Sequence, residues 1–81
     1  MTEQTLVTKS NFDQIFAATK SGDATMYVLG AYGSVVINAK TIAKFENAGH
    51  EVIKKAADGD GFYLQQGRSS NYVLPGYLIA V

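Results

Sequence analysis

The last five residues of the sequence, "YLIAV" at 77–81, limit the folds open to this chain more than any other stretch does. In an extended strand, alternate side chains point to opposite faces. One face would carry Tyr77, Ile79 and Val81, and the other would carry Leu78 and Ala80. Such a strand is apolar on both faces, and at an exposed sheet edge it would promote aggregation. We therefore expect it either to lie between two strands of its own sheet or to pair with a second copy.

The dipeptide before this run favours pairing of the last strand with a second copy of the chain. Pro75 has no backbone N–H to donate, and Gly76 gives the backbone additional freedom, so the last strand is able to leave its own hairpin. The prediction is a homodimer in which residues 77–81 of two copies pair and form one continuous sheet across a two-fold axis.

A first helix is indicated over residues 10–22. The spacing i, i+3, i+4 and i+7 from Phe12 defines one helical face. Ser10 followed by Asp13 predicts a capping box at the start of the helix, and Gly22 predicts a left-handed residue at its end.

A second helix is indicated over residues 38–49. Asn38 is a favourable N-cap, and Gly49 closes the helix after "NA". Its large apolar residues are few, among them Ile42 and Phe45. A helix with so narrow an apolar face needs a sheet to pack against.

The remaining segments favour strands. The stretch "ATMYVLGAYGSVVIN", residues 24–38, is rich in Tyr, Val and Ile and predicts one long strand or a hairpin that turns at residues 30–34. "HEVIKKA" and "FYLQQG" alternate on either side of "DGDG", which predicts a second hairpin. "GRSSN" is a turn that leads into "YVL" and then into the last strand.

These elements predict a small single α+β domain that covers residues 1–81, with the order α-β-α-β-β and a further strand at the end. Two helices pack on one face of a mainly antiparallel sheet, and residues 1–9 form a terminal segment open to fraying. The predicted core residues are Phe12, Ile15, Phe16, Ile42, Phe45, Val52 and Leu64.

Composition excludes several classes of function. Basic and acidic residues number seven each, whereas a protein held mainly by phosphates would be visibly basic. The chain has no cysteine, which excludes disulfides and thiolate sites and agrees with a reducing cytoplasm. The N-terminus does not match a signal peptide, and no apolar run approaches the length of a membrane helix. We expect a cytoplasmic protein.

No catalytic, metal or cofactor motif emerges from the sequence. His50 follows a helix-closing glycine and has no patterned partner, and the "DGDG" turn at 58–61 lacks the later ligands of a calcium loop. The glycines around Ser34 precede a strand, not the helix that a phosphate site requires. We expect no enzyme; a hydrolase would require Ser34, His50 and a carboxylate to converge.

Residues 38–68 carry one resemblance to a known family. A helix, a closing glycine and a hairpin with basic residues are similar to the recognition helix and wing of a winged-helix DNA-binding domain. The resemblance implies nucleic-acid binding through helix 38–49 and hairpin 51–67. The implied phosphate contacts are Lys40, Lys44, Lys54, Lys55 and Arg68. Such a domain has another helix just upstream, where this chain has "TMYVLGAYGSVVI".

The last third of the chain favours protein binding instead. Tyrosine and arginine are enriched at the buried centres of protein interfaces. The candidate contact residues are Tyr63, Gln65, Arg68, Tyr72 and Tyr77. The leading hypothesis is a small non-enzymatic module that binds another protein through its C-terminal sheet, of the kind that phages and mobile elements use to inhibit a host enzyme or defence complex.

Overall fold

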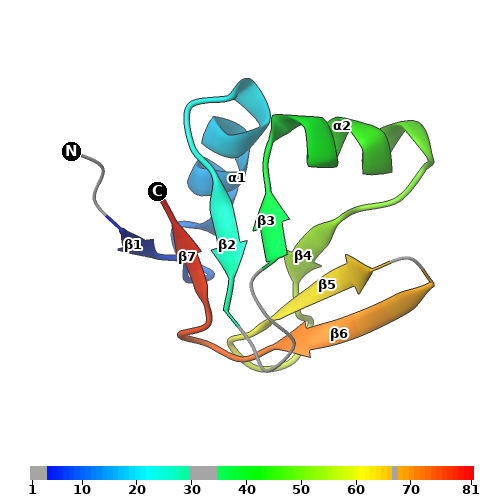
Figure 1. Ribbon diagram of the computed structural model, residues 1–81. Helices are drawn as coiled ribbons and strands as arrows, with labels where there is room; N and C mark the ends of the chain where they lie inside the picture. The colour runs from blue at the N-terminus through cyan, green and yellow to red at the C-terminus, as the bar shows by residue number, and fades with distance from the viewer. Residues whose placement is uncertain (1–3, 30–34, 67) are drawn as a thin grey trace.

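A computed structural model describes residues 4–29, 35–66 and 68–81 of the chain. Within these residues, two helices and seven strands form two antiparallel sheets (Figure 1). In chain order the elements are β1 (Thr5–Leu6), α1 (Phe12–Ser21), β2 (Met26–Val28), β3 (Val35–Ile37), α2 (Ala39–Asn47), β4 (Ile53–Lys55), β5 (Phe62–Gln66), β6 (Ser69–Val73) and β7 (Leu78–Ala80). The α+β class is confirmed, and the expected sheet is divided into two.

The four-stranded sheet has the order β1-β7-β2-β3. Its strand β7 pairs with β1 on one side and with β2 on the other, so Ile79 lies opposite both Leu6 and Tyr27. Leu78 and Ala80 are buried, whereas Tyr77 is exposed, which confirms the alternation predicted for the last strand. Of the two alternatives drawn from the sequence, the fold adopts insertion into the chain's own sheet. Strand β7 therefore has no free edge for the predicted pairing of residues 77–81 between two copies.

The three-stranded sheet has the order β4-β5-β6 and contains the predicted hairpin on either side of "DGDG". Residues 69–71, which we expected in a turn, begin strand β6. Ser70 lies opposite Gln65, and Asn71 lies opposite Leu64. Polar residues can be part of this strand, because β6 lies at the edge of the sheet and one of its faces is exposed to solvent.

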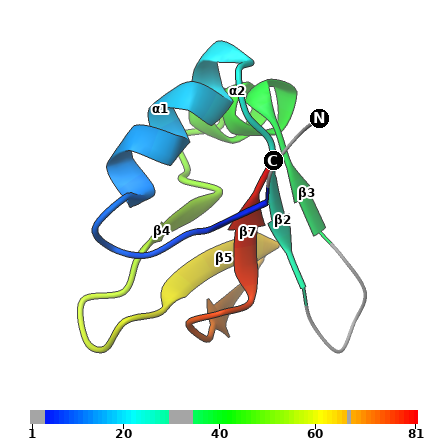
Figure 2. The same cartoon turned by 90° about the vertical axis from the view of Figure 1, so that its left-hand side faces the viewer.

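The core lies between the two sheets and beneath the helices (Figure 2). Phe62 is fully buried, and its ring centroid lies 5.1 Å from that of Phe12 in α1. Of the predicted core, four residues are buried and three are partly buried against the cluster. The first group is Phe12, Ile42, Val52 and Leu64, and the second is Ile15, Phe16 and Phe45.

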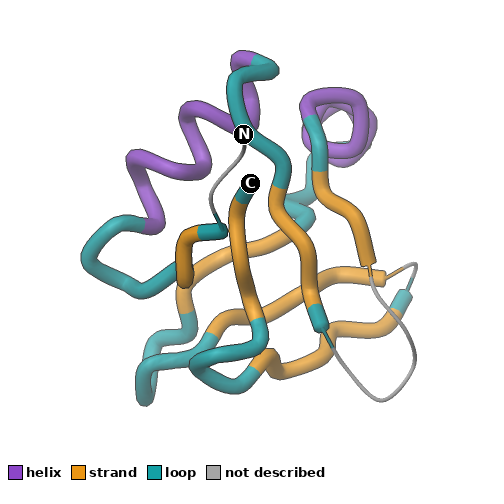
Figure 3. Tube along the Cα trace, turned by 60° about the vertical axis from the view of Figure 1, so that its left-hand side comes forward, coloured by secondary structure: helices purple, strands orange, loops and turns teal. Residues whose placement is uncertain are grey.

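Both helices lie at the same end of the molecule (Figures 1 and 3). An ion pair of 2.9 Å between Lys20 of α1 and Glu46 of α2 links their exposed sides. A single sheet would leave its second face open to solvent. Here the inner face of each sheet covers the inner face of the other, so the apolar residues of both join one cluster.

At three of the four helix ends, the residue that caps or closes the helix is the one predicted from the sequence. Gly22 and Gly49 have positive φ, 94° and 81°, as expected for residues that close helices. Asn38 caps α2 by accepting a hydrogen bond from the Thr41 N–H at 3.0 Å. The capping box predicted at Ser10 was wrong, because Asn11 is the N-cap of α1.

The Asn11 side chain bonds the loop before α1 instead of the helix itself. Its Oδ1 accepts from the Thr8 N–H at 2.7 Å, and its Nδ2 donates to the Leu6 carbonyl at 3.0 Å. Val7, between these residues, is buried, and β1 pairs with β7. Part of the terminal segment that was open to fraying is thereby held in the fold.

Replacement of Phe62, the buried aromatic residue between the sheets, tests how the two sheets pack. We expect Phe62→Ala to lower the free energy of unfolding by about 3–5 kcal/mol, because it opens a cavity between the sheets. Leu74→Ala is the control, since Leu74 is exposed, and it should change stability by less than ~1 kcal/mol. Equilibrium urea denaturation measures both, and equal effects would contradict the assignment of the core.

Candidate functional site

The outer face of the three-stranded sheet carries a row of side chains from three adjacent strands. Lys54 lies opposite Tyr63, which in turn lies opposite Tyr72. Their neighbours along the strands, Leu64 and Val73, are buried on the inner face, so the row points away from the core. We call the outer face formed by Lys54, Tyr63, Gln65, Ser70 and Tyr72 the tyrosine face.

The two tyrosines of this face form an aromatic pair. Their ring centroids are 5.5 Å apart with an angle of 73° between the ring planes, an edge-to-face contact. The Gln65 N–H donates to the Val52 carbonyl, so Gln65 and Tyr63 turn their backbone groups toward β4. Tyr63 and Tyr72 are therefore a pair without mutual backbone bonds, which is the pairing that brings side chains closest.

The Tyr72 hydroxyl also holds the turn before β5. It accepts a hydrogen bond from the Gly61 N–H at 3.0 Å. A Cβ atom at Gly61 would overlap the Tyr72 ring and lie 2.5 Å from the Val73 carbonyl oxygen. Only glycine permits this approach of ring and backbone, so Tyr72 has a structural role as well as an exposed side.

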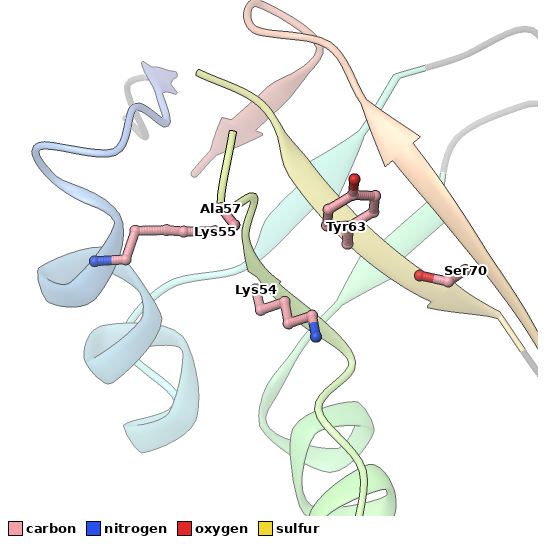
Figure 4. A pocket seen from close by; sticks show the side chains of 5 residues that line it. All are labelled: Lys54, Lys55, Ala57, Tyr63 and Ser70. Atoms are coloured by element: carbon pink, nitrogen blue, oxygen red, sulfur yellow. The ribbon is translucent and has the colours of Figure 1, made fainter. Parts of the chain in front are cut away.

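An open depression of about 360 Å³ lies beside Tyr63 (Figure 4). It is lined by Lys54, Lys55, Ala57, Tyr63 and Ser70. The Lys55 ammonium points toward α1 and lies 3.2 Å from the Asp13 carboxylate. Lys54 forms no ion pair with any described residue, so its charge remains available at the rim of the depression.

The structure brings together only part of the predicted protein-binding set. Tyr63, Gln65 and Tyr72 share the tyrosine face, and the exposed Arg68 lies at the β5–β6 turn. Tyr77 lies on the four-stranded sheet instead, next to β7. Sequence reasoning missed Ser70 because it assigned that residue to a turn.

The cations predicted to contact nucleic acid occupy several surfaces. Lys40 and Lys44 are exposed on α2, whereas Lys54 and Lys55 point in different directions from β4 (Figure 4). The element before α2 is the strand β3, where a winged-helix domain has a helix. Nucleic-acid binding stays a prediction.

The residues considered for catalysis do not form a described cluster. His50 is exposed, and Ser34 lies outside the described residues. Across residues 4–29, 35–66 and 68–81, no three His, Asp or Glu side chains are grouped to hold a metal ion. None of the helices in the same ranges has the length and apolar character needed to cross a membrane.

Comparisons of this chain with protein-family models, with curated proteins and with solved structures give no match. Any assignment of function therefore depends on the chemistry of the described surfaces.

Tyr63 and Tyr72 allow a matched test of the hydrogen bond between the Gly61 N–H and the Tyr72 hydroxyl. We expect Tyr72→Phe to lower the free energy of unfolding by about 1–2 kcal/mol, because the Gly61 N–H loses its acceptor. Tyr63→Phe should change it by less than ~0.5 kcal/mol, since the Tyr63 hydroxyl bonds to no described residue. Urea denaturation of the two variants decides, and a larger effect of Tyr63→Phe would refute the role given to Tyr72.

Proposed function

We propose that the chain is a small non-enzymatic module that binds another protein through the tyrosine face. The observation that carries this proposal is the Tyr63–Tyr72 pair, which is 38% and 43% exposed at the centre of an open sheet face. Tyrosine provides a large and rigid contact area together with a polar end, which is why it is common at the centres of protein interfaces.

The surroundings of the pair support this class of partner. The depression beside Tyr63 offers a recess for one partner side chain, and Ser70 supplies a hydroxyl at its edge. Lys54 favours a carboxylate of the partner in that position, because its ammonium forms no ion pair within residues 4–29, 35–66 and 68–81 and an opposite charge would satisfy it. The turns at either end of the sheet, with Arg68 at one and Asp60 at the other, provide a polar rim.

A module of this kind acts by covering a surface of its partner, and it needs no chemistry of its own. The small size of the chain and a sequence in which no catalytic motif emerges suggest a more specific role for this module. It would be a phage or mobile-element inhibitor of a host enzyme or defence complex. We retain it as the proposed biological setting.

Nucleic-acid binding is the second candidate, and it rests on the position of Lys54 beside Tyr63. An aromatic ring next to a cation is the arrangement on which bases stack while phosphates are neutralised. Lys40, Lys44, Lys55 and Arg68 would add to the charge. The formal net charge of zero favours the protein partner, since phosphate binding depends on an excess of basic residues.

Two matched double variants test the proposal. The tagged full-length chain captures its partner from a native host lysate, and calorimetry with the purified partner then gives the affinity. Tyr63→Ala with Arg68→Ala should weaken binding by ~2 kcal/mol or more, about 30-fold, with an unchanged circular dichroism spectrum. Lys40→Ala with Lys44→Ala is the control on α2 and should leave the affinity unchanged.

The opposite pattern would contradict the proposal. A partner that binds the Tyr63/Arg68 variant as tightly as the wild type must contact another surface. Binding to single-stranded or duplex nucleic acid that falls steeply with salt, and that the α2 variant weakens, would favour the second candidate.

A further inference from the structure

The strand β6 forms one edge of the three-stranded sheet. Among the strands that the structure describes, it is the last in the order β4-β5-β6, and it lies at the margin of the molecule in Figure 1. Its residues Ser69–Val73 pair with β5 in one unbroken register, and the first four of them are exposed. One side of β6 is therefore bonded to its own sheet, and the other side is directed to solvent.

Hydrogen bonds between β4 and β5 show which way the backbone groups of β6 face. The Gln65 N–H donates to the Val52 carbonyl at 2.8 Å, so Gln65 turns its backbone groups toward β4. Successive residues of a strand alternate in this respect, so Leu64 turns its backbone groups toward β6. Leu64 lies opposite Asn71, and the backbone groups of Asn71 are therefore directed to β5.

The same alternation directs the N–H and carbonyl groups of Ser70 and Tyr72 away from the sheet. These groups form no backbone hydrogen bond with a residue in 4–29, 35–66 or 68–81. The exposed Arg68 lies just before them in the chain, and Leu74, which is 57% exposed, lies just after them. We call this margin of β6, from Arg68 to Leu74, the open edge.

The other described edge strands are protected in ways that β6 is not. Strand β1 has two residues and β3 has three, and β4 has three residues of which two are Lys54 and Lys55. Short length and lysine side chains both discourage pairing with another chain. Strand β6 has five residues, and none of them is charged or proline. It is therefore the edge best suited to accept a further strand.

Unpaired N–H and carbonyl groups at alternate positions of a strand match one kind of occupant, which is another extended backbone. The two ends of the open edge limit its side chains. Arg68 forms no ion pair with a described residue and favours a carboxylate, whereas Leu74 favours an apolar side chain. In an antiparallel added strand, the more stable arrangement, that carboxylate lies toward the C-terminal end of the segment.

A second copy of the chain fits these ends poorly. Two β6 strands that pair in antiparallel orientation with full overlap would place Arg68 opposite Leu74 of the other copy. Residues 68–74 contain no acidic side chain, so neither guanidinium would gain a carboxylate from the paired strand. The open edge is better matched by a segment of a different protein.

We propose that the partner protein supplies an extended segment that pairs with the open edge as a fourth, antiparallel strand of this sheet. An acidic residue near the C-terminal end of the segment lies beside Arg68, and an apolar residue near its start lies beside Leu74. The inference rests on the proposed function, because a residue opposite Tyr72 on the added strand extends the row of Lys54, Tyr63 and Tyr72 across the tyrosine face.

Amide hydrogen exchange on the full chain, followed by NMR, tests the open edge without any substitution. In the free protein the Ser70 and Tyr72 amides should exchange at least about tenfold faster than the Asn71 and Val73 amides, because only the second pair is bonded to β5. Equal protection of all four amides would mean that the edge is already covered, and it would overturn the proposal.

Proline at one position tests the pairing itself. Ser70→Pro removes an outward N–H and places a ring on the open edge, and edge strands accept proline where the N–H faces solvent. Ser70→Ala is the matched control, since it keeps the N–H. Both variants should retain the circular dichroism spectrum of the wild type, whereas Asn71→Pro should lose stability because its N–H faces β5. A Ser70→Pro variant as unstable as Asn71→Pro would overturn the assigned direction of the backbone groups.

The probe is a phage-displayed library of random linear peptides about ten residues long, selected on the tagged full chain. Enriched peptides should bind the wild type and Ser70→Ala within about twofold, and Ser70→Pro at least about tenfold more weakly. They should also carry an acidic residue in their C-terminal half, and Arg68→Ala should remove the advantage of that residue. No enrichment, or peptides that bind Ser70→Pro like the wild type, would overturn the proposal.

Failure of this inference is distinguishable from failure of the proposed function. A captured partner that loses affinity with Tyr63→Ala and Arg68→Ala, yet binds Ser70→Pro like the wild type, supports the tyrosine face and overturns strand addition. A partner that none of these substitutions affects overturns both. A partner that distinguishes Ser70→Pro from Ser70→Ala, and that protects the Ser70 and Tyr72 amides from exchange, supports the added strand.

Discussion

The pairing of the last strand, β7, between β1 and β2 is the constraint on which the rest of the structure depends. Its two ladders satisfy both edges of the segment that would otherwise be most prone to aggregate. They also tie the N-terminal segment to the fold, because β1 has no other neighbour in the sheet. Leu78 and Ala80 then complete the core on the inner side, and Tyr77 and Ile79 remain for the outer side.

The division into two sheets gives the molecule two outer faces of different chemistry. The tyrosine face combines aromatic rings, hydroxyl groups and the Lys54 ammonium, which forms no ion pair with a described residue. The outer face of the four-stranded sheet carries Leu6, Ile79, Tyr27 and Val36, none of which is charged at neutral pH.

Tyr72 links the stability of the fold to the candidate site. Its hydroxyl satisfies the Gly61 N–H, and its ring supports Tyr63 edge to face. The turn at 58–61, which at first suggests a calcium loop, is instead shaped to receive this ring. Removal of Tyr72 would therefore disturb folding and the proposed binding surface together, whereas Tyr63 and Arg68 allow that surface to be altered with little structural cost.

Local patterns in the sequence determined the two helices, three of their four caps, the hairpin around "DGDG" and the alternation of the last strand, because each depends on neighbours within a few residues. The α+β class follows from them. Only the tertiary structure decided that Asn11 caps α1 in place of Ser10, since its side chain is directed to the preceding loop. Local patterns also did not determine which strands pair with β7 or how the strands divide into two sheets. Backbone pairing between strands joins residues that are distant in sequence. For the same reason Tyr77 was grouped with Tyr63 and Tyr72, although pairing places it on the other sheet.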